Sequence, residues 1–162
     1  MDVLERWFRD NGGYMHPAVH LARDDEHGGH IRTSSDLAPA THIMTVPYSL
    51  TLSCLNAMVD DRFPVFKESA DSFTVEALGF FYLMTQCIHR DTSFWKPYLD
   101  TLPTPEEGFS TPFWFEDEEL RWLEGTDLHP SFLARQEVWK RYWEDGMEVL
   151  RRKGVDSEPY TW

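Results

Sequence analysis

The chain has 162 residues, a length typical of one domain that can bury a sizeable core. Hydrophobic residues make up 41% of the chain and aromatic residues 15%, which argues against a disordered protein. Asp and Glu number 28 against 15 Lys and Arg, and the resulting formal net charge of -13 argues against nucleic acid and membrane surfaces as partners.

The first part of the chain predicts one helix followed by short strands. The helix is expected over residues 2–10, because its apolar residues fall on one helical face and Gly12 follows its end. Strands are expected over residues 18–22, 29–33 and 42–46, with turn-rich segments between them.

The rest of the chain predicts helices. Residues 50–59 fit a short helix, and residues 72–89 fit a longer one with Ser72 as its N-cap. The acidic run 116–119 is expected to open a short helix, where negative charge suits the positive end of the helix dipole. The last and longest helix is expected over residues 131–153.

Strands that come first and helices that come later indicate an α+β protein. We expect one domain over residues 1–162, with the strands in 1–58, a mostly helical region in 59–162 and a loop over 101–112. The two cysteines give neither a disulfide framework nor a zinc pattern. The sequence contains no signal-peptide core, and its apolar runs are shorter than the ~20 residues that a membrane-spanning helix needs. We therefore expect a cytoplasmic protein.

Two stretches of the sequence carry more specific motifs. The first runs from Trp7 to Leu52 and includes Gly28-Gly29-His30-Ile31-Arg32 and Ile43-Met44-Thr45-Val46-Pro47. The second is Ser93-Phe94-Trp95-Lys96-Pro97-Tyr98-Leu99-Asp100-Thr101-Leu102-Pro103, which continues to Thr126. Together they resemble the SET-domain methyltransferases related to the Rubisco large-subunit enzyme and its actin-histidine relative. The resemblance implies the N-terminal SET strands followed by the helical insertion of that family.

The departures from the family pattern shape the functional expectation. The family has a Gly-x-Gly turn against S-adenosylmethionine, but His30 stands at the second glycine position. No Asn-His dipeptide, a cofactor contact in the family's C-terminal half, occurs in these 162 residues. We therefore expect a truncated SET-like fold that binds no cofactor and transfers no methyl group by itself. A rearrangement, a homodimer or another chain is expected to cover its open sheet edges.

Four histidines and three carboxylates lie between residues 16 and 30. Because histidine gives and takes protons near neutrality, His30 is our first candidate for a general acid, with His27 and Asp24 beside it. A polar turn or a harmless substitution explains the same residues equally well. No metal site is predicted, because the spacing matches no strict metal motif.

Aromatic residues form the candidate binding set. They are Tyr48, Trp95, Tyr98, Phe113, Trp114 and Phe115. Aromatic residues at such spacings are usually core, but the run of three after a loop is harder to bury and suits a pocket or a protein contact. The resemblance places this neighbourhood near the substrate side.

Three functions follow from these observations. The first is a repurposed scaffold that binds an apolar small molecule and catalyses a cofactor-independent cyclisation or isomerisation with His30 as acid. The second is a non-catalytic pseudoenzyme that binds a protein partner through its sheet edge. The third is a residual methyltransferase that another chain completes. We favour the first, because an abandoned cofactor cavity is already concave and largely apolar.

Overall fold

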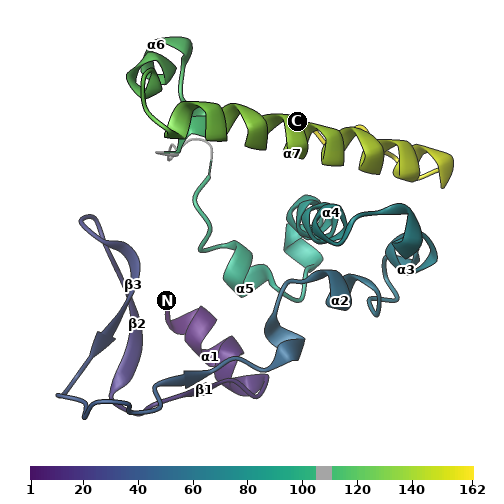
Figure 1. Cartoon of the computed structure of the whole chain (residues 1–162). Helices are drawn as coiled ribbons and strands as arrows, with labels where there is room; N and C mark the ends of the chain where they lie inside the picture. The colour runs from purple at the N-terminus through teal and green to yellow at the C-terminus, as the bar shows by residue number, and fades with distance from the viewer. Residues whose placement is uncertain (105–110) are drawn as a thin grey trace. The chain divides into compact units, whose positions relative to one another are not determined.

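A computed structural model describes residues 1–104 and 111–162 of the chain, which form two compact units. Unit 1 comprises Met1–Leu52 and His89–Leu102, and unit 2 comprises Ser53–Ile88 and Pro103–Trp162. Each unit therefore combines two separate segments of the chain. These segments can be followed in Figure 1, where the colour runs with the residue number. Helices and small antiparallel sheets together confirm the α+β class.

Unit 1 holds all the strands that the structure describes. Its elements are α1 (Asp2–Asp10), β1 (Tyr14–Met15), β2 (Val19–Asp24), β3 (Gly28–Thr33), β4 (Met44–Thr45), the 3-10 turns η1 (Tyr48–Leu50) and η3 (Arg90–Thr92), and α5 (Lys96–Leu99). The strands form two separate antiparallel pairs, β1 with β4 and β2 with β3. The three predicted strands are present, whereas β1 was not predicted.

The core of unit 1 is small and joins α1 to the strands. Its buried residues are Phe8, Met15, Val19 and Leu50. Helix α1 ends where predicted, with Gly12 in the left-handed region at φ 88° just beyond its last turn. The chain then returns to the core at Met15, whose carbonyl accepts a hydrogen bond from Arg9 Nη1 at 3.0 Å.

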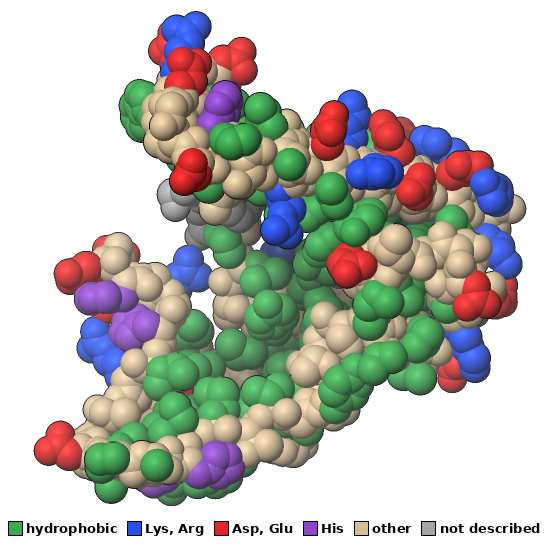
Figure 2. Space-filling view, viewed as in Figure 1, with side chains coloured by type: hydrophobic (Ala, Val, Ile, Leu, Met, Phe, Trp, Pro, Cys, Tyr) green, Lys and Arg blue, Asp and Glu red, His purple; other side chains and the backbone are tan. Residues whose placement is uncertain are grey.

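The regular elements of unit 2 among its described residues are all helices or 3-10 turns. Its elements are α2 (Cys54–Ala57), α3 (Pro64–Glu68), the 3-10 turns η2 (Ala70–Ser72), η5 (Pro112–Trp114) and η6 (Arg121–Leu123), α4 (Val75–Ile88), α6 (Asp117–Leu120) and α7 (Leu128–Arg152). The outer face of α7 carries interspersed acidic and basic side chains (Figure 2), as expected for the solvent side of an amphipathic helix.

Helix α4 begins later than the sequence predicted. We expected Ser72 as its N-cap, but Ser72 ends the turn η2 and the helix starts at Val75. Thr74 takes the capping role, because its Oγ1 accepts a hydrogen bond from the backbone N–H of Ala77 at 3.1 Å. Several Ser and Thr residues precede this helix, so composition alone did not identify the cap.

Close packing of α4 against α7 forms the core of unit 2. Gly146 of α7 faces the ring of Phe81, and a Cβ atom at that glycine would lie 2.1 Å from Phe81 Cε2. The Phe81 ring is buried and stacks on Tyr160 with centroids 5.8 Å apart. Tyr160 in turn shares a 2.7 Å hydrogen bond with Thr85 Oγ1, which fixes the segment after α7 against α4.

A partly buried polar network fixes the loop before α3 onto α4. Asp60 accepts hydrogen bonds from Tyr82 Oη at 2.8 Å, Gln86 Nε2 at 3.2 Å and Arg62 Nη2 at 2.8 Å. Burial raises the pKa of Asp60, but the hydrogen bonds from Arg62 and Tyr82 outweigh it and hold that pKa below its ordinary value. Burial and the bond to Asp60 raise the pKa of Tyr82.

Candidate functional site

The histidine-rich segment forms the end of the β2–β3 hairpin. A three-residue loop joins Asp24 to Gly28, and Gly28 adopts the left-handed conformation, φ 61°, that this class of hairpin loop favours. On the face that Figure 2 shows, histidine side chains gather on this hairpin beside acidic and basic side chains. The structure thus brings together all three predicted catalytic residues, Asp24, His27 and His30.

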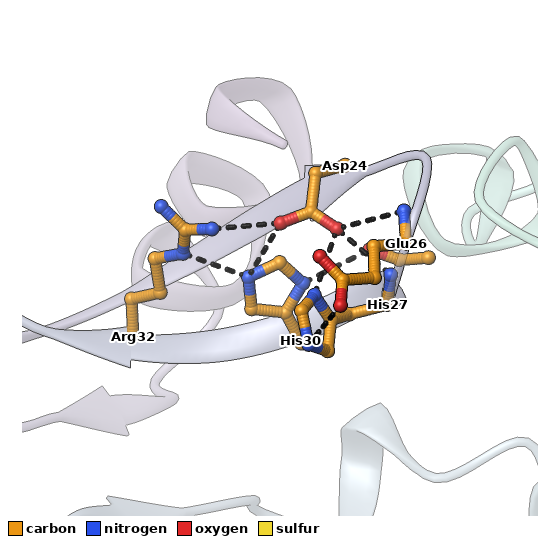
Figure 3. Close-up of polar contacts among 6 residues, drawn as sticks. Asp24, Glu26, His27, His30 and Arg32 are labelled. Carbon is orange, nitrogen blue, oxygen red and sulfur yellow. Dashed lines mark hydrogen bonds and ion pairs between the residues drawn. The ribbon is translucent and has the colours of Figure 1, made fainter.

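Hydrogen bonds connect these side chains mainly to one another (Figure 3). Asp24 Oδ1 lies 3.1 Å from His27 Nδ1, and Asp24 Oδ2 accepts a 2.7 Å hydrogen bond from Arg32 Nη2. His30 Nε2 accepts a 2.9 Å hydrogen bond from Arg32 Nε, and His30 Nδ1 lies 3.0 Å from the carbonyl oxygen of Gly28. Because Nε2 is an acceptor, the proton of His30 belongs on Nδ1, where it is donated to that carbonyl.

The electrostatics of this hairpin cluster (Asp24, His27, His30 and Arg32) suit a stable polar turn. The backbone N–H of His27, together with the His27 ring and the Arg32 guanidinium, lowers the pKa of Asp24 below its ordinary value. Both ring nitrogens of His30 already have partners. The geometry therefore provides an ionised carboxylate held by its neighbours, not a proton donor free to meet a ligand.

Strand alternation decides which way His30 faces. His30 pairs with Ala22 across the hairpin, so it shares a face with Asp24 and Arg32. Leu21 and Val19 lie on the opposite face, and Val19 is buried in the core. The sequence predicted that these histidines would cluster, but the face they occupy followed only from the register.

The hairpin cluster does not fit the cofactor that the family resemblance implies. S-adenosylmethionine would need polar groups able to hold its charged amino-acid end, whereas His30, Asp24 and Arg32 bond to one another. The imidazole of His30 also fills space that a glycine would leave open.

An apolar pocket lies on the core side of unit 1. It has a volume of about 420 Å³, and we call it the N-terminal pocket. Its walls come from α1, three strands, the segment after β4 and α5, and its lining residues are Leu4, Trp7, Phe8, Met15, Leu21, Met44, Val46, Leu50, Thr51, Leu52 and Tyr98. Ten of these eleven residues are apolar or aromatic, so the pocket suits an apolar ligand.

The predicted binding residues are distributed over both units. Tyr98 lines the N-terminal pocket, whereas Trp95 is buried and Tyr48 is 56% exposed. In unit 2, Phe113 stacks on Trp139 with centroids 4.3 Å apart, and Trp114 is 54% exposed. A sixth predicted residue, Phe115, follows η5 in unit 2.

Most residues of the N-terminal pocket were not among the predicted binding residues. Trp7 and Phe8 were recognised only as the apolar face of α1, and Met15 and Met44 belong to two-residue strands without a pattern. The pairing of β1 with β4, in which Met15 lies opposite Met44, brings these two methionines together. No local sequence signal indicates that pairing.

Within residues 1–104 and 111–162, no three His, Cys, Asp or Glu side chains are placed to hold a metal ion. Over the same residues, no helix combines the length and the apolar character that crossing a membrane requires. Neither Cys54 nor Cys87 forms a disulfide within the described residues.

Comparison with known proteins relates the chain to a methyltransferase. No family model matches it. It is similar to actin-histidine N-methyltransferases, with 25% identity to the Papio anubis and human proteins over 144 residues and 26% to the mouse protein. These alignments cover 86% of this chain and 23% of each relative, so the chain spans about a quarter of the length of the curated relatives it matches. The similarity supports a distant methyltransferase-like relationship.

Proposed function

We propose that this methyltransferase-related chain binds an apolar small molecule in its N-terminal pocket and transfers no methyl group by itself. The observation that carries the proposal is the pocket of about 420 Å³, lined by apolar side chains from α1, the strands, the segment after β4 and α5. A volume of this size lies in the range that small-molecule sites occupy, roughly 300–1,000 Å³.

Burial of apolar surface supplies the binding energy in such a site. Each Å² of apolar surface that leaves water contributes about 25 cal/mol, so a ligand of two fused rings gains several kcal/mol before its ordering costs. Trp7 and Tyr98 offer large aromatic surfaces, and Met15 and Met44 adapt their shape easily. These side chains favour a flat or branched apolar ligand over a polar one.

The position of His30 supports binding without catalysis. The general acid expected from the sequence lies on the hairpin face opposite Leu21, a residue that lines the pocket. Its ring nitrogens are already engaged by Arg32 and by the carbonyl of Gly28. A general acid must come within hydrogen-bond reach of the atom it protonates, so the proposal includes no acid step.

A second candidate function is the binding of a protein partner at the hairpin, and the partner that the exposed strand edge fits directly is a second copy of the chain. Strand β3 pairs only with β2 among the described residues, so its other edge offers unpaired backbone groups. Ile31 of this strand is 47% exposed on the same face as Leu21. Light scattering of the purified protein, with Ile31→Lys as the variant, tests this candidate: self-association that the lysine abolishes favours it.

The main proposal is tested by titration with N-phenylnaphthylamine, a neutral dye that fluoresces in apolar surroundings. Val46→Trp places a bulky ring in the pocket wall and is expected to weaken dye binding at least about fivefold. Val59→Trp is the matched control, because Val59 is 73% exposed in unit 2 and lies outside the pocket. Equal dye affinity of the two variants contradicts the proposal.

A further inference from the structure

A second pocket lies within unit 2, between α4 and α7. We call it the aromatic pocket; it has a volume of about 240 Å³, and six of its nine lining residues are aromatic. These six are Phe80, Phe81, Trp139, Tyr142, Trp143 and Trp162. No Lys or Arg is among the nine lining residues.

The rings of this pocket are held at large angles to one another. Phe80 and Trp139 have centroids 6.0 Å apart and planes at 67°, and Trp143 and Trp162 have centroids 6.0 Å apart and planes at 56°. Phe113 stacks on Trp139 with centroids 4.3 Å apart and planes at 19°, so a further ring covers one face of this indole. Rings that are inclined to one another can line a half-open pocket, whereas parallel stacked rings leave no space between them.

The charge distribution favours a cation in the aromatic pocket. The face of an aromatic ring carries partial negative charge and attracts an ammonium group, most strongly for tryptophan. The whole chain adds a formal net charge of -13. A neighbouring hollow, which shares Phe80, Trp139 and Tyr142, contains one acid, Glu76, and one base, Arg135. These two side chains balance each other, so the preference for a cation rests on the rings and on the overall field.

We propose that the aromatic pocket binds a quaternary ammonium group. Such a group is bulky, apolar on its surface and positively charged, so it uses both the apolar walls and the ring faces. It has no N–H to donate, and the pocket accordingly needs no dedicated acceptor. This site belongs to unit 2 and is independent of the N-terminal pocket and of the function proposed for it.

The test compares choline with its neutral isostere dimethylbutanol, in which a carbon replaces the ammonium nitrogen. If only apolar burial acts, the neutral isostere binds more tightly, because it loses less hydration on entry. If the rings act on the charge, choline binds more tightly by at least about fivefold. The sign of the difference therefore separates the two mechanisms, and binding of neither ligand overturns the proposal.

Methionine methyl groups locate the bound ligand. Met84 lines the aromatic pocket, whereas Met15 and Met44 line the N-terminal pocket, so NMR of isotope-labelled methionine methyl groups distinguishes the two sites. Choline is expected to shift the Met84 signal and to leave Met15 and Met44 unchanged. Shifts confined to Met15 and Met44 overturn the assignment to unit 2 without affecting the function proposed for unit 1.

Variants of exposed tryptophans complete the experiment. Trp162 is 60% exposed and lines the pocket, and Trp122 is 76% exposed and does not. Trp162→Leu is expected to weaken choline binding several-fold, Trp162→Phe to weaken it less, and Trp122→Leu to leave it unchanged. Equal choline affinities of Trp162→Leu and Trp122→Leu contradict the proposal. Circular dichroism of each variant confirms that the helices are retained.

Discussion

The contact between Gly146 and Phe81 makes a sharp test of how α4 packs on α7. In Gly146→Ala, the new Cβ lies 2.1 Å from Phe81 Cε2, against 3.4 Å for the shortest ordinary contact, so the ring must retreat by about 1.3 Å. The ring has little room to do so, because it is buried against Phe73 and Tyr160.

The expected magnitude follows from two opposing effects. Alanine favours a helix interior over glycine by about 1 kcal/mol, whereas forcing extra volume into a packed core costs about 1–3 kcal/mol. Since three atoms of the Phe81 ring lie within 2.7 Å of the added carbon, the cost of the added volume exceeds the gain in helix propensity. Taking the upper part of that cost, about 2–3 kcal/mol, and subtracting the gain of about 1 kcal/mol, we expect Gly146→Ala to lower the free energy of unfolding by about 1–2 kcal/mol.

A matched glycine in α4 supplies the control. At Gly79, the nearest atom to an added Cβ is Cys54 N at 3.9 Å, which is an ordinary contact. Gly79→Ala should therefore raise the free energy of unfolding by about 0.5–1 kcal/mol. Urea denaturation followed by tryptophan fluorescence measures both variants. The packing of α4 on α7 is refuted if Gly146→Ala is as stable as the wild type.

Three further predictions concern polar groups. Asp60→Asn, compared with the exposed Asp61→Asn, should lower the free energy of unfolding by about 1–3 kcal/mol. Folding lowers the pKa of Asp60 below its ordinary value of 3.8. The stabilisation by Asp60 is therefore present above about pH 4 and is lost as the pH falls through the folded-state pKa. A difference in urea midpoint between the wild type and Asp60→Asn that is the same at pH 3 and pH 7 would contradict this prediction. Thr85→Val should destabilise by about 1–3 kcal/mol, since it removes a buried partner of Tyr160, and the effect should shrink in a Tyr160→Phe background. His30→Ala should leave the affinity for N-phenylnaphthylamine unchanged, because His30 lies on the face opposite the pocket. A loss of affinity of about fivefold would indicate that His30 contacts the bound dye.

Helical periodicity predicted the longer elements well. The apolar faces of residues 2–10, 72–89 and 131–153 correspond to α1, α4 and α7, each within three residues at either end. Their side chains repeat every turn, so the pattern is visible along the sequence itself. The acidic run 116–119 opens α6 as predicted. Its side chains also cap the helix, because Glu119 Oε2 accepts a hydrogen bond from the backbone N–H of Glu116.

Contacts between distant segments were not predictable in the same way. The two-residue strands β1 and β4 contain too few residues to show alternation, and their pairing joins Met15 to Met44. Tyr98 reaches the same pocket from α5, more than fifty residues further along the chain. The predicted loop at residues 101–112 lies partly outside the described residues, which end at 104 and resume at 111.

The candidate site was also predicted from the sequence only in part. The sequence predicted that Asp24, His27 and His30 would lie together, because only a short turn separates them. It did not reveal that strand register places His30 on the face opposite Leu21. A shift of one residue in that register would reverse the result, and only the pairing of Ala22 with His30 fixes it.

We propose that the N-terminal pocket binds an apolar ligand and that the chain does not bind S-adenosylmethionine. One NMR series on the backbone amides and the isotope-labelled methionine methyl groups tests both parts, with N-phenylnaphthylamine and S-adenosylmethionine added in separate titrations. The Met15 and Met44 methyl groups report on the pocket, and the His30 amide reports on the hairpin. We expect the dye to shift the Met15 and Met44 signals and S-adenosylmethionine to shift neither these signals nor the His30 amide. Saturable shifts of the His30 amide or of the two methionines with S-adenosylmethionine, or no methionine shift with the dye, would contradict the proposal.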